Sequence, residues 1–286
     1  MPTIVLIALL FFLFVATVIA GIFLFLNRHV NDHNIPLLTP NHASNTMQNV
    51  LAILAHPDDE VMIAGTLAKL KKAGVQTHLL YLTHGEDGPT GGLAPQAELG
   101  ALRARELATV GEILQVDTLE ILNFPDRYLT QVPATEITIA VQARIEQINP
   151  DTIICFDQTV GLYGNSDHIV AGKVAQALAA KLDVKNLLIM TLPQPMIDLA
   201  LKVSQTFKER YDAENGLPAA NGCIKISCFS KQKKAVIAAH QTQKSVMNDV
   251  QPLWDKMPAW LYYRIFAKEY FNYRSNASTG GTNERK

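Results

Sequence analysis

The stretch LAILAHPDDE, residues 51–60, joins a buried segment to a cluster of acids. Five apolar residues lead into His56, and Pro57 is followed by the acids Asp58, Asp59 and Glu60. A short, continuous apolar run is typical of a β-strand that is buried on both faces. Three adjacent carboxylates repel one another and add nothing to a core, so they predict a function at the end of this strand.

Strand-like and helix-like segments alternate along the middle of the chain. The apolar runs lie at 49–55, 77–83, 119–124, 152–157 and 186–192, and helical patterns separate them at 60–73, 96–114, 135–148 and 169–182. Connections of this length imply parallel strands with right-handed crossovers. We expect a Rossmann-like, doubly wound α/β domain with a mainly parallel sheet flanked by helices, which a short strand at 223–229 completes.

The two ends of the chain differ from this domain. Residues 4–26 are predicted to form a transmembrane anchor, and 27–48 a polar linker with two prolines. Residues 49–274 form the predicted catalytic domain. The polar segment 275–286 is predicted to be a disordered tail.

The N-terminal segment from Ile4 to Leu26 carries no charge. As a helix it reaches roughly 34 Å, enough for a hydrocarbon layer of about 30 Å. A buried core helix and a signal peptide cleaved after Ala20 are the alternatives, but no Lys or Arg precedes the apolar run. We expect a retained single-pass anchor, and Arg28 on its C-terminal flank favours a cytoplasmic catalytic domain.

Charge and cysteine content exclude some classes of function. The formal net charge of −1 argues against a nucleic-acid partner, and the run KQKK at 231–234 indicates a solvated helix start. Cys155 lies in an apolar run, whereas Cys223 and Cys228 lack metal-knuckle spacing. A disulfide between Cys223 and Cys228 is possible, but three cysteines give no disulfide framework.

The strand ends predict where the site lies. In doubly wound sheets, ligands bind outside the carboxyl ends of the strands. The residues that follow four of the apolar runs should therefore meet at one rim, and these are the ranges 56–60, 84–88, 126–127 and 157–168. His, Asp and Glu are concentrated in them.

Spacing favours a metal at this rim. His56 and Asp59 lie at a strand-to-helix turn, and His168 begins a helix after the fourth strand. Two imidazoles and a carboxylate match a catalytic Zn²⁺ site that keeps one position for water. Asp58 would then be the spare carboxylate that takes a proton. Alternatively the acids only cap a helix N-terminus, the role we expect for Glu60.

The motifs resemble those of the LmbE-like/PIG-L family of zinc-dependent N-deacetylases. The resemblance covers most of residues 49–245. The matching segments are AHPDDE, THGEDG, LRARELATVGEILQVDTLEILNFPDR, a G-x-x-D-H loop and KKAVIAAHQTQ. Five segments in the same order make this resemblance specific.

The resemblance implies one zinc ion per chain, held by His56, Asp59 and His168, with Asp58 as general base. It also implies that Arg103 contacts substrate, although an ion pair of Arg103 with Glu106 or another acid is equally open. Family members remove acetyl from N-acetylglucosamine conjugates, some of them lipid-linked, which would suit a membrane anchor. The oligomeric state stays open.

One position departs from the family pattern. The family loop is commonly H-x-x-H, but this chain has Asn165 at the first histidine. An asparagine amide can donate a hydrogen bond to an oxyanion but cannot cycle a proton. Asp167 would then anchor a neighbour or cap the helix. The alternatives are a weak or inactive relative that binds a glycan or glycolipid, and a metal hydrolase of another amide.

Four further residues have less specific predictions. His84, Glu86 and Asp126 are expected to line the substrate pocket at the rim, though a plain turn explains the first two equally well. His240, in the last motif, is expected to pack behind the site.

Overall fold

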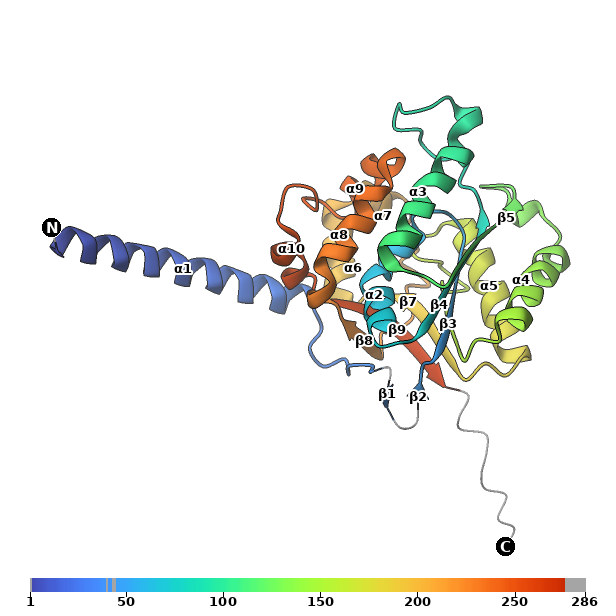
Figure 1. Ribbon diagram of the computed structural model, residues 1–286, viewed down its shortest axis with the longest axis horizontal. Helices are drawn as coiled ribbons and strands as arrows, with labels where there is room; N and C mark the ends of the chain where they lie inside the picture. The colour runs from blue at the N-terminus through green and yellow to red at the C-terminus, as the bar shows by residue number, and fades with distance from the viewer. Residues whose placement is uncertain (1, 40, 43–44, 276–286) are drawn as a thin grey trace, which may run out of the picture.

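The computed structural model describes residues 2–39, 41–42 and 45–275 (Figure 1). The predicted tail lies outside the described residues except for Ser275. Helix α1 (Pro2–Val30) extends away from the remaining elements as a single long rod, so the predicted anchor continues four residues beyond Leu26.

A seven-stranded sheet forms the centre of the domain, in the order β5-β4-β3-β6-β7-β9-β8. All pairings from β5 to β7 are parallel, and β9 is antiparallel to both β7 and β8. The strands are β3 (Asn49–Leu54), β4 (Gln76–Thr83), β5 (Thr118–Phe124), β6 (Thr152–Cys155), β7 (Asn186–Thr191), β8 (Gly222–Lys225) and β9 (Lys268–Ser275). The predicted doubly wound, mainly parallel sheet is confirmed.

Helices cover both faces of the sheet (Figure 1). One layer contains α2 (Ala64–Lys72), α3 (Leu99–Leu114) and α8 (Ser230–Ala239), and the other contains α4 (Ala134–Ile148) and α5 (Ser166–Lys181). Four further helices lie on the side of the domain from which α1 extends: α6 (Gln194–Val203), α7 (Gln205–Arg210), α9 (Lys244–Val250) and α10 (Ala259–Ile265). The 3₁₀ turns are η1 (Asp59–Met62), η2 (Gln96–Glu98), η3 (Leu129–Gln131), η4 (Ser227–Phe229) and η5 (Gln241–Gln243).

Two short segments of the predicted linker contact each other or the sheet. The strands β1 (Asn41–His42) and β2 (Asn45–Thr46) pair with each other. Leu38 N donates to Cys223 O at 2.8 Å, and Cys223 N donates to Pro36 O at 2.9 Å. Residues 36–38 therefore cover the outer edge of β8, which would otherwise expose unpaired backbone groups.

Strand β3 places the site. Residues 50–55 are fully buried, so the strand is rigid up to the point where its apolar sequence stops. The chain runs outward from β3 through β4 to β5 and then returns to β6, on the other side of β3. The carboxyl ends of β3 and β6 thus lie at the topological switch point, where doubly wound sheets bind ligands.

Candidate metal centre

The loop after β3 is held in shape by Asp59. Its Oδ2 accepts the backbone N–H groups of Ala55 at 2.9 Å and His56 at 2.8 Å. The residue before it, Asp58, has a left-handed backbone with φ 116°, a conformation that costs an aspartate about 1–3 kcal/mol. The turn therefore fixes both carboxylates against the end of the strand.

Three predicted ligands converge in the structure. The Nδ1 atom of His56 lies 3.7 Å from Asp59 Oδ2, and His168 Nε2 lies 3.0 Å from Asp59 Oδ1. One potential ligand atom from each residue lies within 4.8 Å of the others, and all three residues are buried. This His/Asp group is a site compatible with a metal ion.

The unpaired atoms of His168 support this interpretation. Among the described residues, neither ring nitrogen of His168 makes a hydrogen bond of regular geometry, although the side chain is 1% exposed and Nε2 faces the Asp59 carboxylate. A buried polar nitrogen without a partner is costly. A cation between His168, Asp59 and His56 would satisfy it, so the donor set fits the predicted ion.

Two further carboxylates orient His56. Its Nε2 lies 3.2 Å from Asp126 Oδ1 and 3.3 Å from Asp167 Oδ2. A ligating histidine usually donates its second N–H to a carboxylate, which fixes the tautomer. With the proton on Nε2, the lone pair of Nδ1 is on the side of Asp59. His56, Asp126 and Asp167 also form a second group with metal-ligand spacing.

The charges change the pKa values of these groups. Burial alone would raise the pKa of Asp59, but His168 and His56 lower it far below its usual range. Burial would lower the pKa of His56, yet Asp126, Asp167 and Asp59 raise it well above 6.5. The concentration of negative charge that favours imidazolium equally favours a bound cation.

Burial raises the pKa of Asp58 to about 6, even though Arg103 opposes the shift. Arg103 Nη2 lies 3.1 Å from Asp58 Oδ1, and the same group donates to Pro57 O. Its Nη1 donates to Gly85 O at 2.8 Å. Arg103 is therefore a buried partner of Asp58. The alternative pair with Glu106 does not form, because Glu106 accepts two hydrogen bonds from Thr242.

Asn165 caps helix α5. Its Oδ1 accepts from the backbone N–H of Asp167 at 2.9 Å and of His168 at 3.4 Å. Since these bonds use the oxygen, the amide nitrogen is directed elsewhere. Asp167 is not the helix cap: its Oδ2 accepts from Arg127 N at 2.7 Å and faces His56, as an anchor would.

The other rim residues form a hydrogen-bonded layer behind the metal-compatible group. His84 Nε2 lies 2.9 Å from Asn123 Oδ1, and Glu86 Oε1 accepts from Asp126 N at 3.0 Å. Asp126 in turn accepts from Asp87 N at 2.8 Å. The structure therefore places His84, Glu86 and Asp126 on the predicted rim, with Asp126 directed at His56.

The prediction that Glu60 caps a helix is wrong. The chain forms η1 at this point, and α2 starts only at Ala64. Glu269 of β9 supplies the carboxylate at the N-terminus of α2, where it accepts from the backbone N–H groups of Gly65 and Thr66. Glu60 is instead fully buried.

Glu60 joins three parts of the structure. It forms an ion pair with His240 and accepts from Tyr81 OH at 2.8 Å and from Asp58 N at 3.1 Å. His240 is itself fully buried, so it packs behind the site as expected. The pair connects the last sequence motif to the turn that carries Asp58.

Two aromatic residues of the site were not identified from the sequence. Phe156 stacks on His168 with ring centroids 4.0 Å apart, and Tyr163 meets His168 edge-on at 5.3 Å. Burial, with Asp59 and Asp58 nearby, raises the pKa of Tyr163, which therefore stays neutral. Their positions beside the fourth strand end were the available signal.

Comparison with solved structures supports the fold. N,N'-diacetylchitobiose deacetylase from Pyrococcus horikoshii superposes with a TM-score of 0.59 and 20% identity, over 80% of this chain and 84% of that one. The 4-carboxy-2-hydroxymuconate hydratase of Pseudomonas putida superposes with a TM-score of 0.57 and 16% identity, over 84% of this chain and 100% of that one. The same fold therefore carries more than one reaction, and only the site can distinguish them.

Sequence comparison is more specific. A Nakamurella multipartita 1D-myo-inositol 2-acetamido-2-deoxy-alpha-D-glucopyranoside deacetylase is 27% identical over 76% of this chain and 89% of its own length. A probable N-acetyl-alpha-D-glucosaminyl L-malate deacetylase 2 of Bacillus anthracis is 29% identical over 68% of this chain and 81% of its own. The family model for PIG-L, GlcNAc-PI de-N-acetylase, matches residues 51–179. Residues 51–179 therefore belong to the PIG-L family, the LmbE-like deacetylase family that the motifs predict.

Proposed function

We propose that this chain is a zinc-dependent hydrolase that removes the N-acetyl group from an N-acetylglucosamine conjugate. The observation that carries the proposal is the convergence of His56 Nδ1, Asp59 and His168 Nε2, with Asp58 beside them. Three protein ligands of this kind are characteristic of catalytic zinc sites. Several relatives of this chain are named as deacetylases of N-acetylated amino sugars.

The protein residues divide the work of amide hydrolysis. Zinc, when bound, would make a water molecule more acidic and polarise the acetyl carbonyl. Asp58 accepts the proton of the attacking water and passes it to the departing amine. Arg103 holds the Asp58 carboxylate in place, while Asp126 and Asp167 hold the His56 ring.

Asn165 is proposed to stabilise the oxyanion. Because its Oδ1 accepts from two backbone N–H groups, its Nδ2 keeps two donors for a substrate oxygen. A donor aimed at developing negative charge lowers the barrier. Asp58 then carries the proton that a histidine at position 165 would otherwise supply.

The proposed substrate is lipid-linked and the proposed location is a membrane. Helix α1 is long and apolar enough to cross a bilayer by length and composition, and the rest of the domain buries none of its most apolar stretch. The exposed apolar side chains along its length require shielding from water by something other than this domain. An anchored site would meet amino sugars presented at the bilayer surface, and Arg28 favours the cytoplasmic side.

A second candidate is a glycan- or glycolipid-binding relative with little activity. The role of Asn165 as a helix cap favours it, because that role alone accounts for the residue. Metal analysis of the purified full chain, combined with acetate release from a panel of soluble and lipid-linked N-acetylglucosamine conjugates, separates the two. Zinc with acetate release supports the hydrolase. Bound zinc without acetate release from any conjugate would support the glycan- or glycolipid-binding relative.

A further inference from the structure

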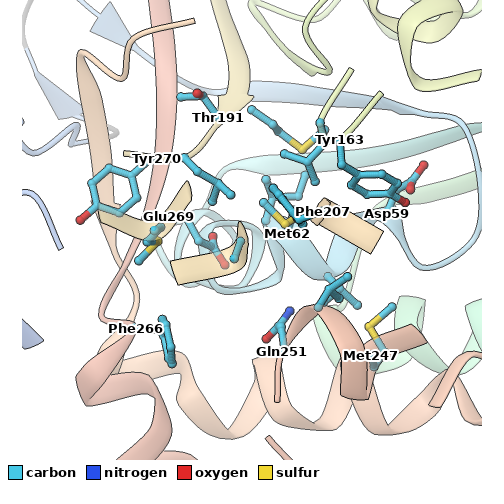
Figure 2. Close-up of a pocket in the computed structure, with 18 of the residues that line it drawn as sticks. Asp59, Met62, Tyr163, Thr191, Phe207, Met247, Gln251, Phe266, Glu269 and Tyr270 are labelled. Atoms are coloured by element: carbon cyan, nitrogen blue, oxygen red, sulfur yellow. The ribbon is translucent and has the colours of Figure 1, made fainter. Parts of the chain in front are cut away.

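An apolar cavity opens from the candidate metal centre and leads away from the polar rim. Its volume is about 220 Å³. Asp58, Asp59 and His168 line one part of it, while Phe266 and Tyr270 line another. Figure 2 shows Asp59 and Tyr270 at opposite ends, with Phe207 and Met62 between them. The cavity therefore connects the reacting centre to a distant part of the domain.

The wall of this cavity is mostly hydrocarbon. Helix α6 presents a stripe with helical spacing into it, formed by Met196, Leu199, Ala200 and Val203. Further lining comes from Phe156, Leu162, Met190, Val246, Met247 and Tyr262. Such a wall offers a ligand dispersion contacts and few hydrogen bonds.

Several polar groups of the wall already have protein partners. The buried Lys233 and Glu269 form an ion pair, so Lys233 is not part of the solvated helix start that the sequence indicated. Thr191 Oγ1 donates to Pro218 O at 2.7 Å, and Tyr270 OH donates to Asn31 Oδ1 at 3.2 Å. A sugar placed here would lose water and gain few new hydrogen bonds, which is costly for each hydroxyl.

The position of the cavity assigns the two sides of the scissile amide. None of the four predicted substrate-binding residues (Arg103, His84, Glu86 and Asp126) lines the cavity. On that polar side His84 and Glu86 are only partly buried and can face a sugar, so the acyl group belongs on the cavity side. The cavity begins at Asp58 and His168, so an acyl group bound beside them would extend along the apolar wall.

The cavity is much larger than an acetyl methyl group. A dry apolar cavity of about 150 Å³ holds a benzene ring, so by proportion this cavity holds roughly eight or nine carbon atoms. An acetyl substrate would leave most of this volume unfilled.

We infer that the site takes amino sugars whose N-acyl chain has roughly eight carbons or more, as a deacylase. This inference deepens the proposed function and rests on it. In the reaction, water adds its oxygen to the acyl carbon, the C–N bond breaks, and the nitrogen gains the protons that the water gives up. The products are a fatty carboxylate and a free amino sugar.

The base of α1 lies against the far end of the cavity. Asn31 Nδ2 donates to Ile265 O at 2.6 Å, and Asn27 Nδ2 donates to Arg264 O at 2.6 Å. These carbonyls belong to the segment that leads into Phe266, which lines the cavity. If α1 spans a bilayer, this end faces the membrane, the source of long acyl chains. Val203, 45% exposed, lies in the cavity wall and is accessible there.

The test compares substrates that place a chain on either side of the amide. Full-length, zinc-loaded protein in lipid nanodiscs is given N-acetyl-, N-butanoyl-, N-octanoyl- and N-dodecanoylglucosamine, and also octyl N-acetylglucosaminide. The variants Ala200→Trp and Val203→Trp fill the cavity from α6. The second of these starts from an exposed residue and so avoids a folding defect. Lys202→Trp adds the same ring to an exposed position of α6 outside the wall and serves as the control.

The expected result is a kcat/KM at least about tenfold higher for the octanoyl than the acetyl amide, since each buried methylene adds binding free energy. Both cavity variants should lower this ratio, and Lys202→Trp should keep it. A ratio of one or less in the wild type, or an unchanged ratio in both cavity variants, overturns the inference. So does a gain from the octyl aglycone without a gain from the octanoyl chain.

If no compound is hydrolysed, the proposed function fails. Calorimetric binding of the same compounds then still tests whether the cavity binds the acyl chain. Tighter binding of the octanoyl than the acetyl sugar, lost in Val203→Trp, supports an acyl site. Equal affinities overturn it.

Discussion

Asp58 combines three features that are rarely found together in one aspartate. It has a left-handed backbone, it lies against the buried Arg103, and burial raises its pKa to about 6. A carboxylate with a strained backbone and a shifted pKa, beside a metal-compatible group, is expected where a proton is transferred. The neighbouring Asp59 has the opposite shift, because two histidines face it.

Replacing Asp58 with Asn should separate metal binding from turnover. The carboxylates and imidazoles that face the ion stay in place, so zinc content should match the wild type. Turnover should fall by roughly 10²–10⁴-fold, the usual contribution of a general base. Acetate release and metal analysis on the same preparation check this. Wild-type activity in the variant would remove Asp58 from the mechanism.

The raised pKa of Asp58 also sets a pH limit. The base must be ionised, so kcat/KM should fall as the pH drops through its pKa. That value is about 6 without a metal, and a nearby dication favours the carboxylate, so the acid limb should lie at or below about pH 6. A pH profile of zinc-loaded enzyme measures it. An acid limb well above this value would assign the titration to another group.

Asn165→His tests the departure from the family pattern. The loss of the cap bonds to Asp167 and His168 should lower the free energy of unfolding by roughly 0.5–2 kcal/mol. Deacylation should be maintained or faster, because an imidazole both donates a hydrogen bond and transfers a proton. Asn165→Ala is the matched control, which loses cap and donor together. A folded, zinc-loaded but inactive His variant would contradict the assignment.

At the scale of elements, the helices and strands that depend on a local residue pattern were predicted from the sequence. The runs at 152–157 and 169–182 became β6 and α5, because continuous apolar segments and helical spacing act over a few neighbours. Strand β9 was not predicted. Its aromatic segment joins directly to α10, and its extended form depends on pairing with β7 and β8 from distant parts of the chain.

The same distinction applies to the site. His56, Asp59 and His168 were predictable because strand ends converge in any doubly wound sheet. The partners of Glu60 and Arg103 were not. Glu60 meets a histidine 180 positions away, and Arg103 reaches back 46 positions to Pro57 O. Such contacts depend on how helices pack over the sheet, which local spacing does not specify.

The Glu60–His240 pair should contribute strongly to stability. Breaking a buried pair on one side costs about 3–5 kcal/mol because it leaves an unpaired charge. His240→Gln should therefore lower the free energy of unfolding by several kcal/mol. Tyr81→Phe, which removes only the hydroxyl bond to Glu60, is the control and should cost about 1 kcal/mol.

The pH dependence of this effect has a definite sign. Burial alone would lower the pKa of His240, but Glu60 raises it above 6.5, so its contribution is complete below 6.5 and is lost as pH rises through the folded pKa. Glu60 is buried too, yet His240 lowers its pKa below 4.5, so its contribution is complete above 4.5 and is lost in acid. The difference between wild type and His240→Gln in urea unfolding should be largest between these values. A difference that grows in alkali would contradict the pairing.

At the scale of the whole molecule, α1 and the catalytic domain are joined by specific contacts. Asn27 and Asn31 donate to carbonyls at the end of α10, and Tyr270 donates back to Asn31. The cavity ends beside the same segment. A rod with exposed apolar side chains, attached where an apolar cavity ends, is the arrangement expected of an enzyme that draws its substrate from a bilayer.

Helix α1 should be retained in the mature protein. A retained anchor should keep the full chain in the membrane fraction through carbonate washing and release it only with detergent, because about 20 apolar residues insert effectively irreversibly. Intact mass should then include residues 4–26. A soluble product that begins after Ala20 would instead identify a signal peptide. Replacing Leu10 and Phe14 with Arg is the matched control: central charges cost about 2.5–3.5 kcal/mol each, so this variant should leave the membrane fraction while β3 and the candidate metal centre stay folded.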